Sequence, residues 1–249
     1  RGGGAVTRGG GGGGGPPPPR RCARAHARDP ATFAIFPPPQ SGSPEPSRVL
    51  SEPLVFIYAD ESCLGNQFKG RARPGGAAGV VEYWHAQKGW IRRDFWTCEP
   101  DTTNNRMAIR SAIIPLAALK QPTRVVFTSD SRYLVDGMTQ WVHGWAARGW
   151  KRKDGEIENL AMWRELVPVA ARHQVQWRWV KGHAGHPQNE YANHLATQAA
   201  AKQIDSGGLI PSRFDAWITE EQEKERYLDF FPMPPDAFEF KAARKLPTR

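Results

Sequence analysis

The hydrophobic and polar positions along the chain divide residues 54–203 into alternating strand-like and helix-like stretches. Short runs of β-branched and aromatic residues predict strands, and longer stretches with apolar residues three or four positions apart predict helices. The predicted strands cover residues 54–62, 77–84, 89–97, 124–130 and 175–180, and the predicted helices cover residues 103–120, 131–141, 157–172 and 188–202. The resulting order, β-β-β-α-β-α-α-β-α, predicts a packed α/β domain.

The two flanking segments have a different composition. Residues 1–53 contain long glycine and proline runs and few apolar residues, so we expect a disordered Gly/Pro/Arg-rich N-terminal extension. Residues 204–249 begin with DSGG and contain the charged run EEQEKER, and we expect a C-terminal extension with one short helix. Residues 54–203 hold nine of the ten tryptophans, so the function is expected there.

The predicted domain is basic, because residues 54–203 carry 20 Lys and Arg against 13 Asp and Glu, a net charge of +7. This excess favours a polyanionic partner. No apolar run reaches the ~18 residues that a membrane span needs, and the first residues lack the apolar core of a secretion signal. We therefore expect an intracellular protein, cytoplasmic or nucleoid-associated, with no membrane contact. The Arg-rich start leaves organelle targeting open.

Two aspartates end strands that are predicted to lie parallel in the sheet. Asp60 closes the first strand and Asp130 closes the fourth. Ligands of open α/β sheets gather at the carboxyl ends of strands, so two acids there indicate a site. The structural alternative for either residue alone is to cap the turn that follows. Both together, beside a glycine-containing loop and the sequence TTNN, favour a function.

Six segments of the chain resemble the motifs of bacterial-type ribonuclease H (ribonuclease HI), in the same order and with similar spacing. They read YADESCLGN, TTNNRM, TSDSRYLVDG, TQWVHGW, RGWK and VKGHAGHPQNE, and together they span nearly all of residues 54–203. The resemblance implies a ribonuclease H-like α/β fold, with a five-stranded mixed sheet flanked by helices. It also implies metal-dependent endonucleolytic hydrolysis of the RNA strand of an RNA:DNA hybrid, with Mg²⁺ or Mn²⁺ as the cofactor.

The resemblance assigns roles to three residues and shows two departures. Asp60 would bridge both metal ions, Asp130 would bind the ion on the leaving-group side, and His183 would assist proton movement or product release. Ala108 stands where the family has a carboxylate, and Asn193 stands where it has an aspartate. Asn193 still offers a neutral carbonyl oxygen. The expected metal ligands are therefore Asp60, Asp130 and Asn193, and metal binding is expected to be weakened.

Glu61 is the nearest acid that could replace a missing ligand. It follows Asp60 directly, and successive side chains of a strand point to opposite faces, so we expect Glu61 to point away from the site. Without a replacement, cleavage is expected to be severely impaired or absent, because the ligands of such a site act as a unit.

The resemblance also implies two groups of nucleic-acid-binding residues. Positions expected near the hybrid's minor groove and a phosphate are Asn66, Thr103, Asn104, Asn105 and Arg106. Positions expected in a basic handle for the DNA strand are Trp141, Arg148, Trp150, Lys151, Arg152 and Lys153. The structural alternatives are helix capping for TTNN and helix packing for Trp141 and Trp145, which are four positions apart.

Three functions remain open at this point. The first is a monomeric ribonuclease H-family protein that recognises RNA:DNA hybrid but cleaves poorly or not at all. The second is an active hybrid endoribonuclease with substitute ligands. The third is a non-catalytic scaffold or assembly protein, in which residues 204–249, with Trp217, Phe230 and Phe231, dock on a protein partner.

Overall fold

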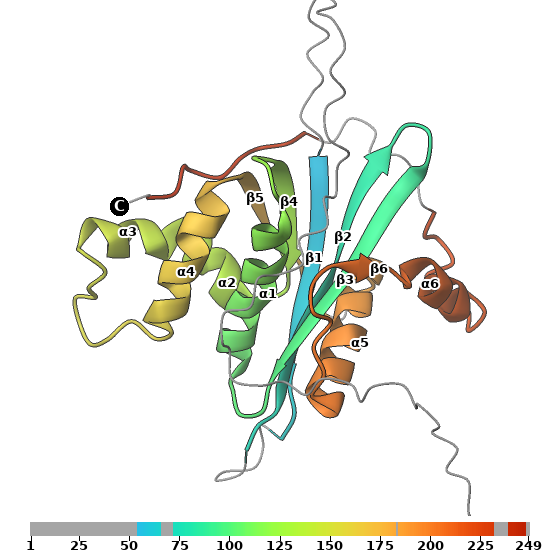
Figure 1. Cartoon of the computed structure of the whole chain (residues 1–249), viewed down its shortest axis with the longest axis horizontal. Coiled ribbons are helices and arrows are strands. Elements are labelled where there is room, and N and C mark those ends of the chain that lie inside the picture. Colours follow the sequence, from blue (N-terminus) through green and yellow to red (C-terminus); the bar gives the residue numbers. More distant parts are fainter. Residues whose placement is uncertain (1–53, 66–71, 183, 232–238, 248–249) are drawn as a thin grey trace, which may run out of the picture.

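The computed structural model describes residues 54–65, 72–182, 184–231 and 239–247, and these form a mixed sheet of six strands with helices on both faces (Figure 1). The expected N-terminal extension, residues 1–53, lies outside the described residues. The strands are β1 (Leu54–Cys63), β2 (Gly75–His85), β3 (Gly89–Glu99), β4 (Arg124–Ser129), β5 (Gln174–Trp179) and β6 (Ile210–Pro211). Their order in the sheet is β5-β4-β1-β2-β3-β6. The pairs β1–β4 and β4–β5 are parallel, and the other neighbours are antiparallel.

The ribonuclease H-like α/β fold is confirmed, but the expected count of five strands is wrong. The additional strand, β6, pairs with the outer edge of β3, where Arg93 and Asp94 face Pro211 and Ile210. Two residues, one of them a proline, carry no alternating pattern of hydrophobic and polar positions. A proline is tolerated at a sheet edge, where its missing N–H breaks no ladder. The position of β6 therefore follows from tertiary contacts and not from its sequence.

The helices lie close to their predicted positions. They are α1 (Asn104–Ala118), α2 (Arg132–Asp136), α3 (Val142–Ala147), α4 (Leu160–Ala171), α5 (Pro187–Lys202) and α6 (Phe214–Gln222), with a π-helical segment η1 (Gly137–Trp141) between α2 and α3. Thr103 caps α1, because its hydroxyl accepts a hydrogen bond from the backbone N of Arg106 at 3.3 Å. None of the helices in the described part of the chain is long and apolar enough to cross a membrane.

The alternation of side chains along β1 separates two hydrophobic clusters. Val55, Ile57 and Ala59 belong to the main core, together with buried residues of α1 and α4. Tyr58 points to the other face and packs on a smaller cluster formed with α5 and α6. The odd-numbered positions of β1 therefore face α1, and the even-numbered positions face α5.

The described C-terminal residues continue the packing of the domain. The buried carboxylate of Asp94 accepts hydrogen bonds from the Tyr191 hydroxyl at 2.6 Å and from the backbone N of Arg213 at 3.0 Å, which fixes the start of α6. Residues 239–247, here called the C-terminal strap, run along β5. The backbone N of Ala243 donates to the carbonyl of Val175 at 2.8 Å, and Leu246 is buried in the main core.

Candidate metal centre and nucleic-acid surface

Asp60 and Asp130 lie just beyond the last parallel pair of β1 and β4, which is Tyr58 with Thr128. The expectation that Asp60 closes its strand is wrong, because β1 continues to Cys63 by pairing with β2. Asp60 is near the end of β1 and is 5% exposed, and Asp130 directly follows β4. One carboxylate oxygen of each lies within 4.8 Å of the other. The expectation that the two acids meet at one edge of the sheet is confirmed.

Glu61 is the third member of this cluster, and the expectation that it points away from the site is wrong. Its carboxylate oxygen lies within 4.8 Å of the oxygens of Asp60 and Asp130. The backbone does alternate, so Glu61 starts from the face of the sheet that α1 covers. However, β1 pairs with β4 only as far as Tyr58, which faces Thr128. Beyond that pair, the neighbour of β1 on this side is Asp130, which follows β4. At such an open end, side chains from both faces converge.

The electrostatics of the cluster favour a cation. Burial, together with the charge of Asp130, raises the pKa of Asp60 well above the ordinary value of an aspartate. Burial, together with the charges of Asp60 and Asp130, likewise raises the pKa of Glu61. Like charges in a poorly solvated site repel, and a divalent ion bound by oxygen ligands would offset that repulsion.

An unpartnered buried oxygen fits a metal site. Within the described part of the chain, Oε2 of Glu61 is buried and has no hydrogen-bond partner. Oδ1 of Asn189 is also buried and has no hydrogen-bond partner. The amide nitrogen of the same side chain donates to Oδ2 of Asp60 at 3.3 Å. A buried acceptor normally finds a donor, so oxygens without one at a carboxylate cluster fit the ligand set of a cation. The donor set consists of hard oxygens, as Mg²⁺ and Mn²⁺ prefer.

Helix α5 closes the cluster on the other face of the sheet. Asn189 contacts Asp60, and the charge of Glu190 also raises the pKa of Asp60. Asn193 lies one helical turn after Asn189 and is half-buried, so the two share a face of α5. The carbonyl oxygen of Asn193 accepts a bond from the hydroxyl of Thr197 at 3.5 Å.

Ala108 is completely buried in the main core, in the second turn of α1. Its methyl group packs on the same face of the sheet from which Glu61 starts. Ala108, which lacks a carboxylate, and Glu61, which supplies one, thus lie on the same side of β1.

The last residue of β5 is bonded to the residue that follows β4. The indole N–H of Trp179 donates to the carbonyl of Asp130 at 2.9 Å, and the ring of Trp179 stacks on the guanidinium of Arg132 at 3.8 Å. Sequence reasoning missed this stacked cation beside the acids, because a tryptophan and an arginine 47 positions apart share no local pattern. His183, expected to assist proton movement, lies outside the described residues.

Gly182 lies against the carboxylate of Asp130, and a methyl group at this position would collide with Oδ2 unless that carboxylate shifts. We predict that Gly182→Ala displaces Asp130 and reduces metal-dependent cleavage about tenfold, as small displacements of reacting groups do. Steady-state cleavage against metal concentration measures the effect. Ala184→Ser, at an exposed position of the same loop, is the control. Equal activity of the two variants would show that the contact with Gly182 does not position Asp130.

The start of α1 places polar groups at its N-terminus. Asn104 is exposed, Asn105 is half-exposed, and Thr103 acts as the cap. The guanidinium of Arg106 is paired with Glu99 at 3.3 Å, so part of its charge is already compensated. Asn66 lies outside the described residues.

The expected basic handle combines packed aromatic rings with exposed cations. Trp141 and Trp145 pack with their ring centroids 5.8 Å apart, which confirms the packing interpretation for this pair. Trp150 has a φ of 61° and lies under the guanidinium of Arg164 at 5.8 Å. After it, Lys151, Arg152 and Lys153 are exposed, and so is Arg148 before it.

Comparison with known proteins agrees with this geometry. A family model of RNase H matches residues 52–201. The ribonuclease H of Vibrio cholerae (classical Ogawa 395) is 47% identical over 147 residues, which are 59% of this chain and 88% of that protein. The ribonuclease H of Caulobacter sp. (strain K31) is 41% identical over 157 residues, 63% of this chain and 96% of that protein.

Two solved structures extend the comparison. The crystal structure of LC9-RNase H1, described as a type 1 RNase H with the type 2 active-site motif, has a TM-score of 0.70 and 51% identity and covers 82% of this chain and 96% of that one. The solution structure of the PFV RNase H domain, at 17% identity and a TM-score of 0.52 over 61% of this chain and 96% of that one, supports the fold alone.

The sheet order, with carboxylates converging where two parallel strands end, defines the ribonuclease H-like class of α/β fold. The match over residues 52–201 then makes the assignment specific. The chain belongs to the ribonuclease H family, which degrades the RNA strand of RNA:DNA hybrids and uses divalent metal ions.

Proposed function

We propose that this protein is an active, metal-dependent endoribonuclease of RNA:DNA hybrids. In it Asp60, Glu61 and Asp130, with the neutral carbonyl of Asn193, hold the divalent ions. The observation that carries the proposal is the convergence of three carboxylates within 4.8 Å. Glu61 supplies the charge that Ala108 lacks, and it does so from the face of the sheet that α1 covers.

The convergence of the three carboxylates also argues against the expectation that cleavage is severely impaired. That expectation depends on two missing charges, at Ala108 and at Asn193, and on the absence of a replacement. With Glu61 in the cluster, one charge is missing and not two. LC9-RNase H1, 51% identical, is described as a type 1 RNase H with the type 2 active-site motif, so a type 1 protein with a different active-site motif has a precedent among similar proteins.

Divalent ions held there would activate a water molecule and stabilise the leaving oxygen of the RNA strand. The chain's own residues bind and orient the hybrid. Asn104 and Asn105 would face the minor groove, where 2′-hydroxyls distinguish RNA from DNA. Thr103 and Arg106 would hold a phosphate at the N-terminus of α1. His183 would move a proton or help the product leave.

The direct test is cleavage of a labelled RNA:DNA hybrid with Mg²⁺ or Mn²⁺, with Asp60→Asn as the inactive control. Turnover by the unmodified protein, lost in Asp60→Asn and with a chelator, supports the proposal. An inert unmodified protein that becomes active only as Ala108→Glu, Asn193→Asp would overturn it. That result would restore the expectation of a site impaired by the loss of two ligands.

Binding of the hybrid should depend strongly on salt, because the handle presents its exposed cations to phosphates. Each phosphate contact contributes about 0.9 to the slope of log K against log salt on a duplex. We predict that changing Lys151, Arg152 and Lys153 to alanine makes this slope less steep by roughly 2–3. The melting temperature should be nearly unchanged. Fluorescence anisotropy in chelator over a salt series measures it. A slope unchanged from that of the unmodified protein would remove these residues from the interface.

A further inference from the structure

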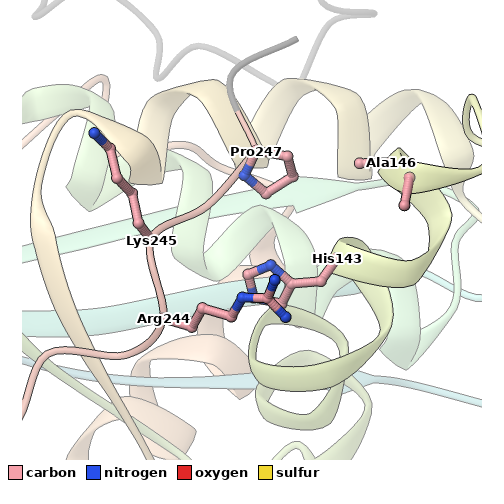
Figure 2. A pocket seen from close by; sticks show the side chains of 6 residues that line it. His143, Ala146, Arg244, Lys245 and Pro247 are labelled. Carbon is pink, nitrogen blue, oxygen red and sulfur yellow. The ribbon is translucent and has the colours of Figure 1, made fainter.

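A pocket of about 350 Å³ lies between α3 and the C-terminal strap, in a region to which neither the fold family nor the proposed chemistry assigns a role. Its lining residues are His143, Ala146, Ala147, Arg244, Lys245 and Pro247. Figure 2 shows the side chains of His143 and Arg244 reaching toward each other from the two segments, while the Lys245 side chain extends away from them. The C-terminal strap and the helix that leads into the basic handle thus line an open pocket together.

The charge of this pocket has one sign. Among the described lining residues, two are cations, one is a histidine, and none is acidic. Burial lowers the pKa of His143, and the positive charge of Arg244 lowers it further, so Arg244 is near enough for its charge to act on the ring. A bound anion would offset the charges of Arg244 and Lys245.

The backbone that carries Arg244 and Lys245 is fixed by the residues on either side. Ala243, just before Arg244, is hydrogen-bonded to Val175 of β5, and Leu246, just after Lys245, is buried in the core. Arg244 and Lys245 are therefore exposed side chains on a backbone fixed at both ends. A preorganised cation loses less conformational freedom when it binds a ligand than one on a loose tail.

One polar atom in the pocket has no partner. Nε2 of His143 is buried and makes no hydrogen bond within the described part of the chain. Buried ring nitrogens normally have a partner, so this atom lacks a group that an oxygen-rich ligand would provide.

We propose that this pocket binds a phosphate group, with Arg244 making the principal charged contact and His143 a supporting hydrogen bond. A guanidinium matches two phosphate oxygens at once, which gives both charge and geometry. The phosphate can come from a nucleic-acid backbone or from a free phosphate compound. The backbone is the source that the position favours, because α3 continues directly into Arg148 and the exposed basic run, so that a bound strand would extend along the handle.

The first experiment needs neither metal nor cleavage, so its outcome is independent of the proposed function. Inorganic phosphate is titrated into the full-length protein, and the ring signals of His143, assigned by their loss in His143→Asn, are followed by NMR. Saturable movement of these signals is expected, with at least tenfold weaker binding in Arg244→Gln, Lys245→Gln. The control Lys88→Gln, Lys202→Gln removes the same charge from two other exposed positions and should bind normally.

Three results would overturn the phosphate site. They are no saturable movement in the unmodified protein, unchanged binding in the pocket variant, and equal loss in the control. If the pocket variant melts at a lower temperature, Arg244→Lys is used instead, which keeps the charge and removes the paired contact. It should bind phosphate with intermediate affinity.

The second experiment separates the two sources of phosphate. Hybrid binding is measured in chelator over a salt series for the same variants. If a backbone phosphate occupies the pocket, the slope of log K against log salt falls by about 0.9 in the pocket variant and not in the control. If the slope is unchanged while inorganic phosphate still binds the unmodified protein, the ligand is a free phosphate compound.

Discussion

Replacing Glu61 by glutamine should reduce Mg²⁺-dependent cleavage of an RNA:DNA hybrid by about 10²–10³-fold, the scale of losing one preorganised electrostatic contact. The amide keeps the size of the side chain but removes its charge from the Asp60–Glu61–Asp130 cluster. Because the three groups hold the ions together, the loss should appear in kcat as well as in the metal dependence. Initial rates on labelled hybrid over a range of Mg²⁺ concentrations measure both.

The double variant Glu61→Gln, Ala108→Glu provides the sharpest control. If Glu61 replaces a carboxylate that the family carries on α1, a glutamate at position 108 should recover part of the activity that the single change removes. Melting of the metal-free Glu61→Gln protein is the fold control. Its melting temperature should equal or exceed that of the unmodified protein, because one of three mutually repelling carboxylates is gone. Full activity of Glu61→Gln would show that Asp60 and Asp130 hold the metal without it.

Replacing Arg92 by methionine should lower the free energy of unfolding by about 3–5 kcal/mol, with a fall in Tm of roughly 6–20 °C. The guanidinium of Arg92 is paired with Glu82 at 2.7 Å, and their side chains are only 5% and 2% exposed. The change leaves a buried carboxylate without its cation. It also removes the stacking of Arg92 on Phe214, at 4.9 Å, which helps to hold α6 on the sheet.

The loss of stability in Arg92→Met should depend on pH. Burial raises the pKa of Glu82, and Arg92 opposes that rise, so the variant raises it further. A carboxyl group whose folded pKa is raised is stabilising below its ordinary value of 4.5 and loses that contribution as the pH rises through the folded pKa. The deficit of Arg92→Met should therefore be small near pH 4.5 and full near neutrality.

Two further variants decide whether the buried pair is responsible. Asp215 also pairs with Arg92, at 2.6 Å, but its side chain is 74% exposed, so Asp215→Asn should change stability by less than about 1 kcal/mol. Removing both charges, as Arg92→Met, Glu82→Gln, should recover much of the loss. Chemical denaturation at two pH values measures the set. A deficit of equal size in Asp215→Asn would assign the effect to the exposed partner.

Much of the fold follows from the sequence, because the strands of the parallel half are short apolar runs and the helices have clear periodicity. The meeting of Asp60 and Asp130 was predictable for the same reason, since the carboxyl ends of neighbouring parallel strands share an edge. The role of Glu61 was not predictable. Side chains alternate between the two faces of a sheet where a strand is paired on both sides, and β1 is no longer paired with β4 at Glu61. The signal that could have found it is the adjacent pair of acids at a strand's end, where β4 has already stopped.

The C-terminal part was less predictable for a different reason. Strand β6 has two residues, and its position depends on contacts between residues far apart, such as the hydroxyl of Ser212 donating to Asp94 at 2.5 Å. The strap is a basic stretch without periodicity, and only Leu246 in the core and the bond to β5 show where it lies. β6 and the strap take their positions by packing on the surface of the folded domain, and a local sequence pattern does not describe that surface.

The C-terminal residues also protect the sheet from its own edges. An exposed edge strand offers unpaired N–H and C=O groups to any other extended chain, and it is a common starting point for aggregation. Here the strap lies along β5 at one edge, and the outermost strand at the other edge, β6, is only two residues long and contains Pro211. β6 pairs with Arg93 and Asp94 in the middle of β3, and the backbone N–H groups of Ser212 and Ser206 donate to Arg92 and Trp96 on either side of that pair. The strap that lines the pocket thus also disfavours the pairing of β5 with another extended chain, including a second copy of this protein.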